Sequence, residues 1–408
     1  MAGRPRWWVA GLSLFLALVV GLVVWLTQRD STYHAPLSAP TTPQASSAEA
    51  TGLLRGLQTS VRRGEPAPAA RLGADGPAAL SLAGVVRNGR ALHVRGFSLR
   101  YVDQAGGVAP DGAFTAYVHA SWRFAGFDPR PERMEVRVRF APHDGHLAIA
   151  GIGGGDRRSP LWLSGPMEVR RSSQALVVVQ GDAAEADRVM GLAARAVPQV
   201  RRVLPGWRGH LVVEVPATEQ RLEGALHADP GQYDGIAAVT TSVDGSPSRR
   251  APVHVFVNPQ TFLPLAQDGA QVVLTHEATH VATSAATTTS PTWLVEGFAD
   301  YVALRAQQIP LRTAAARIIA LDRASGVPTH LPGDDAFATG APHLEARYES
   351  AWLACRLLAD SAGPGALVAF YRAVDGGEPV GAALRAHVGL GLRGLTQRWR
   401  TLLAHLPA

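Results

Sequence analysis

The sequence contains no lysine, so all 39 of its basic residues are arginines, set against 33 acidic residues and a formal charge of +6. A nucleic-acid-binding surface requires a basic stripe or patch, commonly interleaved with aromatic residues. The arginines here are scattered along the chain and form nothing longer than pairs such as Arg62-Arg63 and Arg157-Arg158. We therefore interpret the positive charge as a solvated arginine surface and expect no nucleic-acid partner.

Cysteine is almost absent as well, because Cys355 is the only one among 408 residues. This excludes an intrachain disulfide, and also a lipoprotein anchor, which needs a cysteine directly after the signal sequence. Cys355 lies within an apolar helical pattern, which favours a buried structural thiol over a nucleophile. The composition, 47% hydrophobic and 18% charged, is that of a globular protein, and the length predicts two or three folding units.

Charge is missing altogether from residues 7–28, an apolar run long enough to cross a bilayer as one helix of about 20 residues. A cleaved signal peptide would have a shorter apolar region followed closely by a small-x-small site, whereas the first Ala-x-Ala occurs at 48–50. Arg4 and Arg6 precede the run and place the N-terminus in the cytoplasm by the positive-inside rule. We predict a signal-anchor transmembrane helix at 1–30, and hence a single-pass cell-membrane protein whose remaining chain is extracytoplasmic.

A stalk and a first folding unit are predicted to follow this anchor. Residues 31–50 are rich in Ser, Thr, Ala and Pro, a composition typical of an extended stalk. Residues 51–180 begin with a helical pattern. Alternating strand patterns then follow at 91–101, 114–124, 132–140 and 145–152. A helix followed by antiparallel strands predicts a small α+β accessory domain, which by element order resembles the nuclear-transport-factor-2-like and cystatin-like folds.

Residues 183–408 form the second predicted unit, a small sheet followed by a mostly helical C-terminal half. A helix beginning at residue 183 is expected to end at Pro198, which cannot continue the backbone hydrogen bonds. Strand patterns occur at 209–215, 252–257 and, more weakly, 235–241. The strand at 252–257 fits either a central strand or an edge strand that pairs with an extended peptide substrate.

The strongest chemical signal is the segment His276-Glu277-Ala278-Thr279-His280, which lies in an apolar helical pattern. Residues i and i+4 of a helix lie one turn apart on the same face, so both imidazoles can reach one metal ion. Neutral imidazole nitrogens suit zinc, which keeps one position open for water in catalytic sites. Glu277 lies beside that position, and we expect it to act as the general base.

A second motif supplies the remaining ligand. After a Ser/Thr/Ala-rich loop, Glu296 starts another helical pattern, with 15 residues between it and His280. This loop is long enough to bring the second helix against the first, where a carboxylate completes a His2Glu zinc site. Asp300 lies one turn further on the same face and can accept a hydrogen bond from the outer nitrogen of a ligand imidazole, with His276 as the expected donor. We therefore predict one Zn2+ per chain, held by His276, His280 and Glu296.

Together the two motifs, His-Glu-Ala-Thr-His and Trp-Leu-Val-Glu-Gly-Phe-Ala-Asp-Tyr, resemble the gluzincin clan of zinc metallopeptidases, in particular its bacterial peptidase-MA-like members. The specific part of the resemblance covers residues 272–302. Glu296 and Asp300 are similar to the thermolysin-type Glu-x-x-x-Asp arrangement, whereas Thr283 and Ala286 stand where a metzincin would need Gly and His. The resemblance implies a gluzincin-like domain that hydrolyses peptide bonds in peptide or protein substrates, here anchored to the membrane.

The resemblance also implies a Tyr or His downstream of the third ligand that stabilises the oxyanion of the intermediate. Tyr348 matches best, although a tyrosine that anchors the start of a helix fits the pattern equally. His330 and His343 are weaker matches. Two other functions are compatible with the same residues: a catalytically inactive surface protein that uses a peptidase-like fold for binding, and a zinc hydrolase of a non-peptide amide or ester.

Overall fold

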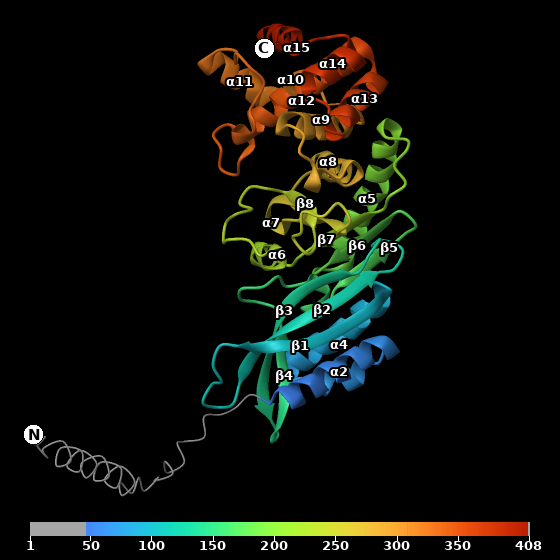
Figure 1. The fold of residues 1–408 in the computed structure, drawn as a ribbon, viewed down its shortest axis with the longest axis vertical. Coiled ribbons are helices and arrows are strands. Elements are labelled where there is room, and N and C mark those ends of the chain that lie inside the picture. Colours follow the sequence, from blue (N-terminus) through green and yellow to red (C-terminus); the bar gives the residue numbers. More distant parts are fainter. Residues whose placement is uncertain (1–45, 308, 407–408) are drawn as a thin grey trace, which may run out of the picture. The chain divides into compact units, whose positions relative to one another are not determined.

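The computed structural model describes residues 46–307 and 309–406. In these ranges the chain is an α+β protein with 14 α-helices and two β-sheets (Figure 1). The predicted fold class needs a correction, because it included a transmembrane helix. None of the helices in the described ranges is long and apolar enough to cross a membrane. The segment expected to form that anchor, 1–30, lies outside the described residues, as does the expected stalk 31–50 up to residue 45.

The first sheet is antiparallel, with its strands in the order β1-β2-β3-β4. They are β1 (Val94–Ala105), β2 (Phe114–Phe124), β3 (Glu132–His143) and β4 (His146–Ile152). Each of them corresponds to one of the four strand patterns found in the sequence. Every second residue of β2 is buried, because one face of the strand contributes to a hydrophobic core that also contains residues of the N-terminal helix α2 (Ser47–Arg63).

Two further helices, α3 (Pro66–Ala70) and α4 (Gly76–Ala91), lie in a Gly-, Pro- and Ala-rich passage where the sequence predicted no element. The cap of α4 is clear in the structure, because the Asp75 side chain accepts a hydrogen bond from the N–H of Ala78 at 2.7 Å. Leu82, Val85 and Val86 of α4 are buried in the core. Tertiary packing therefore stabilises a helix whose composition is unfavourable.

The second sheet has five strands in the order β5-β6-β7-β9-β8. They are β5 (Glu168–Arg171), β6 (Ala175–Val179), β7 (Leu211–Val215), β8 (Ala238–Ser242) and β9 (Val253–Val257). Strands β6, β7 and β9 are parallel, and β5 and β8 flank them in antiparallel pairing. The interpretation of the strand at 252–257 as an edge strand is wrong, because β9 lies between β7 and β8. The edge strand next to it is β8.

Both faces of the three parallel strands β6, β7 and β9 are buried, which accounts for their nearly continuous apolar sequences. Along β6, Val177 belongs to a core formed with the C-terminal helices, whereas Leu176 and Val178 belong to a core shared with the first sheet. Strands β5 and β6 fall at the end of the predicted accessory range 51–180, yet they pair within this second sheet. The sheet thus separates two hydrophobic cores.

Helices make up most of the chain that follows β6. They are α5 (Ala183–Val203), α6 (Glu219–Leu226), α7 (Pro259–Phe262), α8 (Gln267–Thr283), α9 (Thr292–Arg305), α10 (Leu311–Ala314), α11 (Ala316–Ser325), α12 (Leu344–Ala362), α13 (Pro364–Asp375), α14 (Val380–Val388) and α15 (Leu392–Ala404). The prediction that Pro198 ends its helix is wrong, since Pro198 lies inside α5. The helix continues past the proline because Val200 and Val203 are buried in the core.

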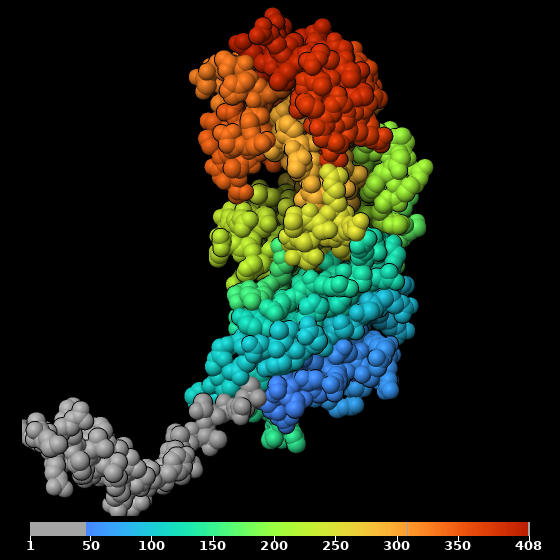
Figure 2. All heavy atoms as spheres, in the orientation of Figure 1, coloured from blue at the N-terminus to red at the C-terminus, as the bar shows by residue number. Residues whose placement is uncertain are grey.

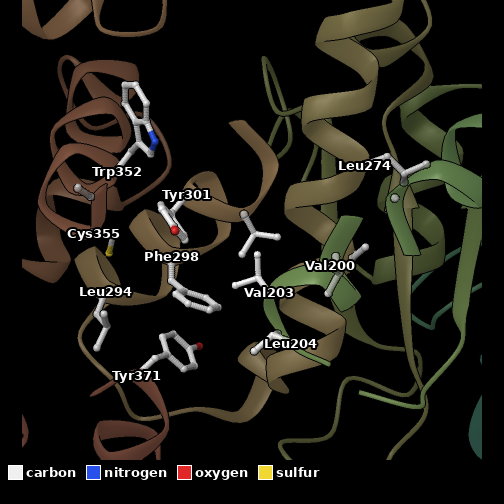
Figure 3. Packing of buried hydrophobic residues seen from close by; sticks show 14 of the residues in the cluster. Val200, Val203, Leu204, Leu274, Leu294, Phe298, Tyr301, Trp352, Cys355 and Tyr371 are labelled. Atoms are coloured by element: carbon white, nitrogen blue, oxygen red, sulfur yellow. The ribbon is translucent and has the colours of Figure 1, made fainter. Parts of the chain in front are cut away.

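Helices α9 and α12 pack closely around Gly297, the residue after Glu296. A Cβ atom added at Gly297 would lie only 2.4 Å from the carbonyl oxygen of Ala351 and 3.0 Å from Sγ of Cys355. Cys355 is fully buried, as predicted, and Figure 3 shows it among the apolar side chains of this core, which include Phe298 of α9. The missing side chain at Gly297 therefore allows α12 to approach the helix that carries Glu296.

Candidate metal centre

Helices α8 and α9 bring His276, His280 and Glu296 together. The Nε2 atoms of the two histidines lie 2.9 Å apart. Oε2 of Glu296 lies 3.1 Å from Nε2 of His276 and 3.2 Å from Nε2 of His280. In the described part of the chain, this is one of two groups of histidine and acidic side chains whose ligand atoms all lie within 4.8 Å of one another. Three donor atoms thus face one small volume.

The donor set and its spacing fit a zinc ion. Two imidazoles and one carboxylate form one of the common ligand sets of catalytic zinc, with metal–ligand distances of about 2.0–2.2 Å. Ligand atoms at such distances around a tetrahedral ion lie roughly 3.3 Å from one another. The three observed separations, 2.9, 3.1 and 3.2 Å, require only a slight opening of this triangle.

Local sequence explains how two helices converge in this way. His276 and His280 share one face of α8 by their i,i+4 spacing. The helix ends at Ser284, whose φ of 57° reverses the chain into the connection to α9. Pro291 then precedes the first residue of α9, a position where its missing N–H costs nothing. Glu296 consequently projects from the second turn of α9 toward the two imidazoles.

Asp300 lies behind the first imidazole. Its Oδ1 is 2.7 Å from Nδ1 of His276, the distance of a hydrogen bond that the imidazole N–H donates. Burial by itself would lower the pKa of His276, but Asp300 and Glu296 outweigh it and raise that pKa well above its usual value. The cluster thus stabilises positive charge at this imidazole. Nδ1 of His280, by contrast, is buried with no hydrogen-bond partner in the described residues.

Glu277 is hydrogen-bonded to Thr240, a residue that the sequence did not single out. The Thr240 hydroxyl, on edge strand β8, donates a hydrogen bond to Oε2 of Glu277 at 2.6 Å. This contact fixes the carboxylate, which is only 7% exposed, beside the helix face that carries the imidazoles. The sequence offered only a weak strand pattern at 235–241, and nothing in it related Thr240 to a helix 37 residues away.

Tyr348 also lies at this centre, near the start of α12. Its ring centroid is 6.3 Å from that of His276, and the ring of Phe337 packs edge-on against it at 5.4 Å. Burial raises the pKa of Tyr348, and the nearby carboxylates of the cluster raise it further, so its hydroxyl stays protonated. His330 and His343 are both exposed, and the structure records no contact of either with the cluster in the described residues.

The rear of α8 is held by a buried polar network. The Thr275 hydroxyl lies 2.7 Å from Oε1 of Gln199 on α5. Gln271 accepts a hydrogen bond from Nε of Arg195 at 2.8 Å and donates one to the carbonyl of Leu192. These bonds attach α8 to α5, so the orientation of the side of α8 that carries both histidines is fixed from behind.

Solvent reaches the cluster. The side chains of His276, His280 and Glu296 are 13%, 10% and 16% exposed. On the face shown in Figure 2, the surface is hollowed between the orange segment that follows α9 and the yellow-green segment that precedes β9. A cluster that is mostly buried but still open to water suits a reaction in which water is a reactant.

Comparison with curated proteins and with solved structures gave no significant match, so the resemblance of the accessory region to two known folds stays a prediction. In the comparison with protein-family models, a model matches residues 232–316. This stretch contains β8, β9, α8 and α9, and with them Thr240, His276, Glu277, His280, Glu296 and Asp300. The region is similar to the BSP family, described as a peptidase of plants and bacteria, and this match indicates a peptidase.

Proposed function

We propose that this chain is a zinc-dependent peptidase of the gluzincin type, with zinc held by His276, His280 and Glu296. The observation that carries the proposal is the meeting of these three donor atoms within 3.2 Å of one another on two adjacent helices. The peptidase match over the same segment supports the reaction class. The hydrogen bond between Asp300 and His276 supports the metal, because ligand imidazoles commonly donate to a carboxylate in this way.

Glu277 performs the proton transfers in the proposed reaction. Zinc, when bound, supplies Lewis acidity that polarises the scissile carbonyl and makes a water molecule more acidic. Glu277 accepts a proton from the attacking water and then delivers it to the leaving amine. Thr240 holds one oxygen of this carboxylate by its hydrogen bond, which leaves the other oxygen to receive the proton.

Tyr348 is assigned to the oxyanion that develops on the scissile carbonyl. A donor at this position must carry its proton at the working pH, and the raised pKa of Tyr348 ensures that it does. Replacement by phenylalanine keeps the ring that packs against Phe337 and removes only the hydroxyl. We expect Tyr348→Phe to retain zinc and to lower kcat, and unchanged kcat with normal zinc content would remove the assignment.

Strand β8 is the proposed binding edge for an extended peptide. It is terminal in the sheet order, and Thr240 connects its middle to the general base. A peptide that adds to a sheet edge gains main-chain hydrogen bonds along its whole length. Such pairing would place the scissile bond of the peptide beside Glu277.

The proposal is tested by zinc stoichiometry together with cleavage of a peptide library. We expect one zinc at this centre in the wild-type chain, cleavage that stops on chelation, and loss of cleavage in Glu277→Gln with zinc retained. Glu65→Gln, which alters an exposed glutamate, is the matched control and should cleave normally. Zinc binding without cleavage of any peptide would refute the peptidase proposal and favour an inactive binding protein or a hydrolase of another amide or ester.

A further inference from the structure

Two ionisable residues interrupt the apolar strands of the second sheet. β7 reads Leu-Val-Val-Glu-Val and β9 reads Val-His-Val-Phe-Val, and their polar residues are Glu214 and His254. Glu214 is 4% exposed and His254 is 1% exposed. His254 is two residues before Phe256, and Glu214 is two residues after Val212; both of these neighbours belong to the core shared with the first sheet. The two polar side chains therefore project toward the first sheet.

The first sheet supplies two acidic residues to the same place. Asp128 lies in the turn between β2 and β3, and Glu132 is the first residue of β3. Oδ1 of Asp128 is 3.0 Å from Nε2 of His254, while Nδ1 of His254 is 2.7 Å from Oε1 of Glu214. The ligand atoms of Asp128, Glu132 and His254 all lie within 4.8 Å of one another. Stacking on Phe124 fixes the plane of the His254 ring.

Glu132 has no partner in this cluster. Its side chain is 0% exposed, and neither carboxylate oxygen forms a hydrogen bond in the described structure. Arg158 is close enough to interact electrostatically with Glu132, but its Nη1 donates to the carbonyl of Val243. The ion pairs found in the described residues do not include Glu132. Such a buried, unpaired carboxylate is expected to coordinate a metal or to be neutralised.

We propose that Asp128, Glu132 and His254 form a second, buried metal site that takes a divalent transition-metal ion such as Zn2+. One imidazole and two carboxylates are a ligand set that suits zinc. The arrangement repeats that of the candidate metal centre. In both places Nε2 of a histidine faces the ligand cluster, while a carboxylate lies 2.7 Å from its Nδ1. Here that carboxylate belongs to Glu214.

The charge balance of the cluster supports a bound cation. Three carboxylates and one imidazole are enclosed together, and the ion pairs found here, among the described residues, join His254 to Asp128 and to Glu214 but leave Glu132 without a counter-charge. A divalent ion would balance this excess of carboxylates and give Glu132 the partner that it lacks.

The position of the second metal site between the two sheets indicates that a metal ion there would stabilise the fold. Its ligands come from both sheets, and Asp128 and His254 are 126 residues apart in the sequence. An ion there would join the β2–β3 turn to β9, and hence the first sheet to the sheet that precedes the candidate metal centre. Because its ligands are all buried, the ion would enter during folding and exchange slowly afterwards.

Zinc content separates this site from the candidate metal centre. The full chain is produced in zinc-supplemented medium, and the number of zinc ions per chain is measured by inductively coupled plasma mass spectrometry. We expect two equivalents in the wild type, one in the double variant His276→Ala/His280→Ala, and none when Glu132→Gln is added to that variant. Exposed His143 and His146 offer a control, because their joint replacement by alanine should leave the wild-type content at two.

A folded double variant, judged by circular dichroism, that contains no zinc would overturn the proposal. If that variant does not fold, Glu132→Gln in the otherwise wild-type chain decides instead: a fall of one equivalent supports the site, and an unchanged content overturns it. As a second measurement, chelator should remove the ion of the solvent-accessible centre from the folded wild type and leave one equivalent, which is released only when denaturant is added.

Discussion

Replacement of Gly297 by alanine tests whether α9 and α12 are in close contact beside the candidate metal centre. In a helix interior alanine is normally more favourable than glycine, by about 0.8–1.0 kcal/mol. The new Cβ, however, would lie 2.4 Å from a backbone oxygen of α12, about 1 Å closer than ordinary van der Waals contact. Because the obstacle is backbone, no side-chain rotation relieves it, and overpacking of this kind costs about 1–3 kcal/mol.

The contact of 2.4 Å with backbone places the cost of overpacking in the upper part of this range, about 2–3 kcal/mol. Overpacking should therefore outweigh the gain in helix propensity, and we expect Gly297→Ala to lower the free energy of unfolding by about 1–2 kcal/mol. Equilibrium unfolding in urea measures this difference. Gly365 in α13 is the matched control, because a Cβ there meets no atom within 4 Å. Gly365→Ala should be neutral or stabilising by up to about 1 kcal/mol. A Gly297→Ala variant that equals or exceeds the wild type in stability would show that α9 and α12 are not in such close contact.

Three other predictions follow from the same region. Asp300→Asn keeps a hydrogen-bond acceptor but removes the charge, so zinc affinity measured by competition with a chromophoric chelator should fall about 10–100-fold; Asp268→Asn, an exposed change on α8, should not alter it. Thr240→Val removes the donor to Glu277 and should lower kcat/KM roughly 10–100-fold with zinc content unchanged. Burial raises the pKa of Glu349 to about 7, so the folded state holds the proton of this side chain more tightly than the unfolded state does. The stability that protonated Glu349 contributes is therefore fully present below pH 4.5 and is lost as pH rises to about 7. After discounting for solvent screening, Glu349→Gln should exceed the wild type in stability by about 1–2 kcal/mol at pH 8, with the difference vanishing near pH 4.5.

Element types were predicted well where one face of the element is buried and the other is not. The alternation along β2 and β3 reflects such a sheet, and the sequence located both strands. Helix α4 was missed because its interior glycines, Gly84 and Gly89, weaken the helical pattern, and contact with the core is what stabilises it. Pro198 was taken as a helix end for a local reason, but burial of Val200 and Val203 keeps α5 continuous.

Chain order was a poor guide to which strand forms the edge of the second sheet. The chain reaches β8 before β9, yet β9 inserts between β7 and β8. Strands of five residues carry little signal of their lateral order, and the apolar strands β6, β7 and β9 are buried on both faces whichever strands flank them. Thr240 was missed for the same reason, since its role depends on β8 lying over α8.

The histidines of the candidate metal centre were visible in the sequence because their geometry is local. An i,i+4 pair on a helix has a fixed spacing, and the 15 residues between His280 and Glu296 suffice to return Glu296 to it. The buried cluster was not recognised, although a charged residue in the middle of Leu-Val-Val-Glu-Val is a signal that could have directed attention to Glu214. Asp128 and His254 meet only because two sheets pack together. Short-range periodicity thus determined the strands of the first sheet and the histidine pair of the candidate metal centre, while contacts between distant strands, which depend on packing of the whole core, decided the rest.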